Sequence, residues 1–128
     1  MLTLPSSVRI YLATGPVDLR KSIDGLGSLA SGRGHDVFSG HLFVFTSRRG
    51  DRVKILCWDC GGFVLYYKRL ERGRFKLPEV APGAQEVRLD ATQLAMLLDG
   101  IDMKRVRAPK RWTPPTQRRQ EVDTRSRS

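Results

Sequence analysis

The chain has 128 residues, of which 23 are lysine or arginine and 13 are aspartate or glutamate, so its formal net charge is +10. With 40% hydrophobic residues it can build one packed core, but it is too short for two domains, and no stretch is long and apolar enough to span a membrane. So strong a positive balance predicts a polyanionic partner, nucleic acid before an anionic membrane. No secretory leader is recognisable, so we expect a cytoplasmic protein.

The first forty residues predict a strand, a helix and a loop. Residues 8–13 are apolar and begin with a β-branched side chain, which favours a strand, and Gly15-Pro16 would end it. We expect Asp18 to cap a helix that follows at once. Its apolar face would consist of Leu19, Ile23, Leu26 and Ala30. Residues 31–40 are rich in glycine and predict a loop.

Three apolar runs in the middle of the chain predict three strands, over 42–46, 53–58 and 63–70. The connections between them, 47–52 and 59–62, are short and contain glycine, which is typical of an antiparallel meander. The runs are almost continuously apolar rather than alternating. We therefore expect both faces of the sheet to be covered, one by the core and the other by a helix or a partner.

The next part of the chain predicts one more strand and one more helix. Residues 86–89 favour a strand, and Asp90 with Gln93 matches the pattern of a helix capping box. Gly100 suits the end of that helix. The apolar face of the helix would consist of Leu94, Leu97, Leu98 and Ile101.

Residues 103–128 hold nine basic and two acidic side chains, and they carry most of the excess positive charge. They contain too few apolar residues to offset the entropy of ordering, so we expect them to be disordered. The sequence thus predicts a compact domain over 1–102 and a flexible basic tail over 103–128. The predicted fold class is α+β, with a mainly antiparallel sheet of four to five strands and two helices.

Two groups of basic side chains flank the predicted meander. In a meander the start of the second strand lies near the end of the third, so we expect both groups to meet at one end of the sheet. There they would contact phosphates, and Trp58, Tyr66 or Tyr67 would offer rings for base stacking. The alternative is a solvated sheet end, partly neutralised by Asp51 and Glu71. The two groups are Arg48, Arg49, Arg52 and Lys54, and Lys68, Arg69, Arg72, Arg74 and Lys76.

Two further sets of cations are candidates for nucleic-acid binding. Arg20 and Lys21 would lie in the first turn of the first helix, where cations oppose the helix dipole but suit a bound anion. The alternative is that both side chains are simply exposed. The tail would add phosphate contacts that do not depend on base sequence. Its candidate residues are Lys104, Arg105, Arg107, Lys110 and Arg111.

Cys57 and Cys60 have the spacing of half a zinc site, and His35 and His41 are the only histidines that could complete it. The alternative, which we favour, is one core cysteine and one turn cysteine. The sequence therefore predicts neither a metal nor another cofactor.

No pattern in the chain indicates an enzyme. A metal-dependent nuclease needs several carboxylates converging on metal ions. The aspartates of this chain fall at predicted turns and caps, where aspartate is common for structural reasons. We therefore expect no catalysis, and a nuclease remains the weakest of the functional hypotheses.

Several segments together resemble one known family. They are residues 8–26, 38–45, 48–56, 67–75 and 93–102. They resemble the small accessory proteins of the insertion sequence sixty-six family of bacterial mobile elements, which are encoded beside the transposase as the second open reading frame. The resemblance implies a protein that supports transposition without being the transposase, and it supplies no catalytic residues. Family members usually carry Trp-Trp-Asp-Gly at the positions of residues 57–60.

The first functional hypothesis is an accessory factor that binds element DNA, with the element ends as the expected target. The second is an adaptor that docks on the neighbouring transposase without specific DNA binding. Neither the oligomeric state nor the step of transposition follows from the sequence.

Overall fold

The computed structural model describes residues 7–100 as five strands and two helices. Ile101 and the predicted tail over 103–128 lie outside the described residues. In chain order the elements are β1 (Ile10–Ala13), α1 (Ile23–Gly32), β2 (Leu42–Thr46), β3 (Arg52–Asp59), β4 (Gly62–Arg69), β5 (Glu86–Leu89) and α2 (Ala91–Leu98). The α+β class, the five strands and the two helices confirm the prediction from the sequence.

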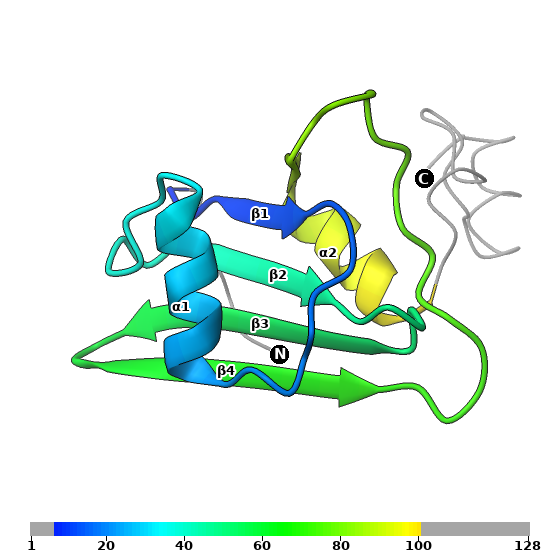
Figure 1. Ribbon diagram of the computed structural model, residues 1–128, viewed down its shortest axis with the longest axis horizontal. Coiled ribbons are helices and arrows are strands. Elements are labelled where there is room, and N and C mark those ends of the chain that lie inside the picture. Colours follow the sequence, from blue (N-terminus) through cyan, green and yellow to red (C-terminus); the bar gives the residue numbers. More distant parts are fainter. Residues whose placement is uncertain (1–6, 101–128) are drawn as a thin grey trace, which may run out of the picture.

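The strands form one mixed sheet in the order β4-β3-β2-β1-β5. β2, β3 and β4 are antiparallel neighbours, as the predicted meander requires, and β5 is antiparallel to β1. β1 and β2 are parallel, because α1 connects them as a crossover. The ends of β1, β2 and β4 and the start of β3 therefore lie at one end of the sheet (Figure 1).

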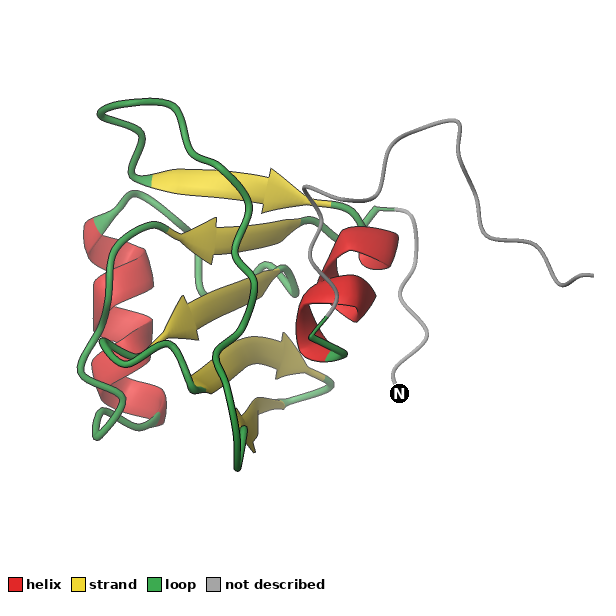
Figure 2. Cartoon of the chain, turned by 90° about the vertical axis from the view of Figure 1, so that its right-hand side faces the viewer, coloured by secondary structure: helices red, strands yellow, loops and turns green. Residues whose placement is uncertain are grey.

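One helix covers each face of the sheet, as Figure 2 shows. Along β2, Leu42 and Val44 belong to the core on the α2 side, whereas Phe43 belongs to the core on the α1 side. Along β3, Ile55 packs on the α2 side and Leu56 on the α1 side. Two cores on one sheet explain why β2 and β3 are continuously apolar. The expectation of two covered faces is confirmed for these two strands, but it is wrong for the edge strand β4, where Val64, Tyr66 and Tyr67 are exposed.

The start of α1 differs from the prediction. The helix begins at Ile23, and Asp18 is not its cap; Ser22 is the N-cap residue and makes no side-chain cap bond. The chain from β1 instead runs across the α1 face of the sheet before it turns into the helix (Figure 1). A Cβ at Gly25 would lie only 3.0 Å from Cβ of Lys21, so this glycine lets the incoming chain pass close to the helix. Leu19 is buried with Leu26 as expected, although it lies before the helix.

The capping box of α2 is confirmed. The backbone N–H of Gln93 donates to Oδ1 of Asp90 at 2.7 Å, and the backbone N–H of Asp90 donates to Oε1 of Gln93 at 2.9 Å. Three leucines of the helix then pack into the core on this face. They are Leu94, Leu97 and Leu98.

The β3–β4 hairpin turns through two residues. Asp59 and Gly62 pair, which leaves Cys60 and Gly61 at the centre of the turn, with φ of 45° and 88°. Two positive φ angles define a type I′ turn, which favours asparagine and glycine. Among the described residues Cys60 is the only non-glycine with a positive φ.

Candidate nucleic-acid interface

The two predicted groups of basic residues meet at one end of the sheet. Arg52, at the start of β3, pairs in register with Arg69, at the end of β4. The chain after β4 then bends against the β2–β3 turn: the N–H of Phe75 donates to the carbonyl of Gly50 at 2.7 Å. The ring of Phe75 is buried and anchors this segment. Arg72, Arg74 and Lys76 are exposed on it. We call the surface around the β2–β3 turn and the end of β4 the basic end. Its cations are Arg48, Arg49, Arg52, Arg69, Arg72, Arg74 and Lys76.

Not every cation of the two groups is free for a ligand. Lys54 lies on the α1 side, where its Nζ donates to the carbonyl of Lys21 at 3.0 Å and stands 5.3 Å from the ring centre of Tyr67. Lys68 faces the opposite side of the sheet, and its Nζ donates to the carbonyl of Leu98 at the end of α2. Both lysines therefore connect elements of the fold, which the sequence did not indicate.

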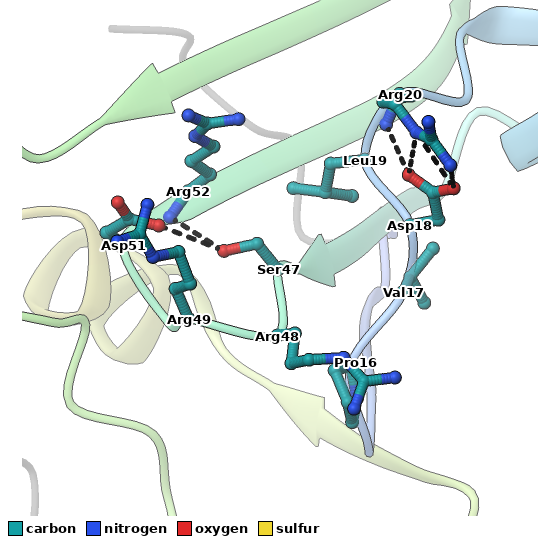
Figure 3. Close-up of a pocket in the computed structure, with 10 residues that line it drawn as sticks. All are labelled: Pro16, Val17, Asp18, Leu19, Arg20, Ser47, Arg48, Arg49, Asp51 and Arg52. Carbon is teal, nitrogen blue, oxygen red and sulfur yellow. Dashed lines mark hydrogen bonds and ion pairs between the residues drawn. The ribbon is translucent and has the colours of Figure 1, made fainter.

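A cleft of about 440 Å³ opens at the basic end between the chain that follows β1 and the β2–β3 turn (Figure 3). It lies beyond the carboxyl ends of the parallel strands β1 and β2. Its lining residues are Pro16, Val17, Asp18, Leu19, Arg20, Ser47, Arg48, Arg49, Asp51 and Arg52. The sequence analysis named the four arginines of this lining as candidate binding residues. It did not predict the cleft, because the cleft depends on the parallel pairing of β1 with β2.

Arg20 and Asp18 form a closed pair on one wall of the cleft. The Nε of Arg20 donates to both carboxylate oxygens of Asp18, and its Nη2 donates to Oδ2 at 2.8 Å. These hydrogen bonds from Arg20 lower the pKa of Asp18 to about 2. The expectation that Arg20 and Lys21 lie in the first turn of α1 is wrong, because both precede the helix, and both are exposed.

The arginines on the other wall make no ion pair in the described part of the chain. They are Arg48, Arg49 and Arg52. The Nε of Arg52 is buried and lacks a hydrogen-bond acceptor there. Asp51 accepts from the hydroxyl of Ser47 at 3.2 Å instead. Of the acids expected to neutralise the basic end, only Glu71 does so, through Arg69 at 3.1 Å.

The three candidate stacking rings are not gathered at the basic end. Trp58 lies near the other end of β3, where its ring packs against Phe38 and Phe63 with centroid distances of 5.1 and 5.0 Å. Tyr66 and Tyr67 are exposed but alternate between the two faces of β4. The ring of Tyr67 lies beside Lys54 on the α1 side.

The two cysteines and two histidines do not form a common site in the described part of the chain. Cys57 is buried in the α2-side core, where burial raises the pKa of its thiol, and Cys60 is exposed in the turn. The Nε2 of His35 lies 2.6 Å from Oε1 of Glu86, and His41 accepts at Nδ1 from the N–H of Arg9. Within residues 7–100 no three histidine, cysteine or acidic side chains converge on a point.

The same residues include no helix long and apolar enough to cross a membrane.

Fold and surface together define a small α+β protein with an arginine-lined cleft at one end of a mixed sheet. Residues 8–108 match the family described as IS66 Orf2 like protein, and the chain belongs to that family. The resemblance seen in the sequence is thereby confirmed, and the family gives the chain an accessory role associated with the transposition of insertion sequences.

Two proteins of Sinorhizobium fredii are similar to this chain, and both are described as uncharacterized. The protein y4jC is 38% identical over 101 residues, which cover 78% of this chain and 85% of y4jC. The protein y4hO is 39% identical over 109 residues, which cover 81% of this chain and 90% of y4hO. No solved structure matches the chain.

Proposed function

We propose that this chain is a non-catalytic accessory factor that binds DNA during transposition through its basic end. The observation that supports the proposal best is a set of three arginines that make no ion pair within residues 7–100, on a turn fixed by backbone hydrogen bonds: Arg48, Arg49 and Arg52. Arg72 and Arg74 extend the same surface. Arginine guanidinium groups pair with phosphate oxygens in a fixed, bidentate geometry.

Residues 103–128 contribute a second, less specific set of phosphate contacts in this proposal. They include the candidate cations Lys104, Arg105, Arg107, Lys110 and Arg111. Contacts to phosphates position a protein on DNA and strengthen binding, but they do not read the bases. The domain over 1–102 would therefore carry any preference for element ends.

A second candidate function is docking on the transposase, and the edge strand β4 favours it. The outer edge of β4 has no strand partner among residues 7–100. On its α2 side Val64 and Tyr66 are each 41% exposed. An unpaired edge flanked by apolar side chains can accept an extended segment of another protein.

The test of DNA binding is a salt titration of affinity for element-end and scrambled duplexes, measured by fluorescence anisotropy. The test variant replaces Arg48, Arg49 and Arg52 by alanine, and the control is Arg88→Ala, an exposed arginine on the opposite edge strand β5. We expect the test variant to lose preference for element ends more than bulk affinity, and the control to behave as the parent chain.

Deletion of the residues after Met103 should have a different effect. It should weaken binding to both duplexes equally and flatten the dependence of log affinity on log salt by about 0.9 for each phosphate that the tail no longer neutralises. If the full chain binds neither duplex at low salt, the DNA-binding proposal fails. Co-purification with the transposase, lost on Tyr66→Lys, would then support the adaptor.

A further inference from the structure

Backbone hydrogen bonds hold both walls of the cleft in place. The N–H of Val17 donates to the carbonyl of Thr46 at 2.9 Å, which ties the chain after β1 to the end of β2. On the other wall, the N–H of Ser47 donates to the carbonyl of Arg52 at 3.0 Å, and the N–H of Arg52 donates to the hydroxyl of Ser47 at 3.2 Å. Arginines are thus placed around a concave space whose walls are fixed by hydrogen bonds.

The charges that line the cleft leave a surplus of two positive charges. Arg20 and Asp18 neutralise each other through three side-chain hydrogen bonds. Asp51 makes no ion pair with Arg48, Arg49 or Arg52, but its formal charge of −1 counts in the lining, which leaves a net charge of +2. An internal phosphodiester carries one negative charge, whereas a phosphomonoester carries between about 1.5 and 2 near neutral pH. The surplus therefore matches a phosphomonoester better.

The side chain of Arg52 gives a second observation that favours a bound anion, independent of the charge count. Its Nε is buried and has no acceptor within residues 7–100. Native proteins leave few buried donors unsatisfied, because the lost hydration is not regained. In Figure 3 Arg48 lies beside Pro16 and Arg52 on the other side of Ser47, so an anion between them would draw the two long side chains together. A rotation of the Arg52 guanidinium would give its Nε–H an acceptor on that anion.

We propose that the cleft binds a phosphomonoester, with the 5′-phosphate at the end of a DNA strand as its ligand. The site lies beyond the carboxyl ends of the parallel pair β1 and β2, the position at which open, mostly parallel α/β sheets bind their ligands. The inference rests on the proposed DNA-binding function and adds to it: the cleft recognises a strand end, while the surrounding cations bind the phosphodiester backbone.

The experiment compares one element-end duplex in two forms, with a 5′-phosphate and with a 5′-hydroxyl, on the full chain. The measured quantity is the ratio of the two dissociation constants, which is independent of the overall strength of DNA binding. We expect the 5′-phosphate to bind about tenfold more tightly, since hydrogen bonds between charged groups are among the stronger ones. In parallel, amide NMR with inorganic phosphate should shift the signals of residues 17–20 and 47–52.

Two cleft variants and one control locate the effect. Arg52→Gln and Arg48→Gln should each bring the ratio close to one. Arg48 is exposed, so its variant tests the site even if the partly buried Arg52 proves necessary for folding. The matched control is Arg72→Gln, because Arg72 is an exposed arginine of the basic end outside the cleft lining. This variant should weaken binding to both duplexes equally and leave the ratio of the dissociation constants unchanged.

The outcomes separate this inference from the proposed function. If the parent chain binds both duplexes equally, the cleft inference is overturned although DNA binding stands. The cleft inference also fails if the Arg72 variant changes the ratio as much as the cleft variants do. If neither duplex binds but inorganic phosphate shifts the cleft signals, the proposed function fails, and the cleft is supported as a site for a small phosphorylated compound.

Discussion

Replacing Cys60 by glycine should stabilise the protein. Cys60 stands at the first central position of the type I′ turn between β3 and β4, with φ of 45°. For a residue with a Cβ, left-handed backbone geometry costs about 1–2 kcal/mol. Glycine avoids this strain but loses about 0.5–1 kcal/mol through the greater freedom of its unfolded chain.

The difference between the two effects predicts a net gain in the free energy of unfolding of about 0.5–1 kcal/mol for Cys60→Gly. The cysteine side chain is exposed, so its removal forfeits no buried surface. For a domain of this size the gain corresponds to a rise of about 2–8 °C in Tm.

Urea unfolding under reducing conditions, followed by circular dichroism, measures this difference. The matched control is Cys60→Ala, which removes the thiol but keeps a Cβ at the same backbone angle. It should leave the free energy of unfolding within about 0.5 kcal/mol of the parent chain. A glycine variant no more stable than the alanine variant would refute the assignment of strain to this turn.

Four further outcomes are expected. The Asp18 carboxyl should titrate near pH 2 by NMR, so its pairing with Arg20 forms as pH rises and is lost as pH falls through that value; Arg20→Gln should return the pKa toward 3.8. Asp90→Ala should lower the free energy of unfolding by about 0.5–2 kcal/mol in chemical denaturation, since it removes the capping box of α2. Elemental analysis should find no stoichiometric zinc in the reduced protein, and one zinc per chain would reopen a ligand role for Cys57 and Cys60. Incubation of element DNA with the chain and Mg²⁺ or Mn²⁺ should give no nicking on a gel.

The elements that the sequence predicted well are those specified by neighbouring residues. Asp90 and Gln93 form the capping box three residues apart, and the short β2–β3 and β3–β4 connections determine antiparallel pairing. The predicted start of α1 was wrong because Asp18 matches the local pattern of a helix cap but forms its hydrogen bonds with Arg20 instead. A hydrogen bond between side chains in a loop leaves no periodic signal in the sequence.

The candidate site was predictable only in part, because some of its contacts join residues that are neighbours in the meander and others depend on the tertiary fold. The register of Arg52 with Arg69 follows from the meander, so the meeting of the two basic groups could be anticipated. The cleft could not, because Val17 reaches the end of β2 only through the crossover that makes β1 and β2 parallel. The opposite directions of Lys54 and Lys68 follow from strand alternation once the boundaries of β3 and β4 are known.

The bond from Lys68 to the carbonyl of Leu98 fixes where the chain leaves the described domain. It holds the end of α2 beside the end of β4, at the basic end of the sheet. The cationic residues that follow Gly100 in the sequence therefore continue from this end of the sheet. A DNA segment held by one set of cations would meet the other at a high effective concentration, so two weak contacts can act as one bivalent binder. A longer linker inserted after Gly100 would then reduce avidity without removing a single charge.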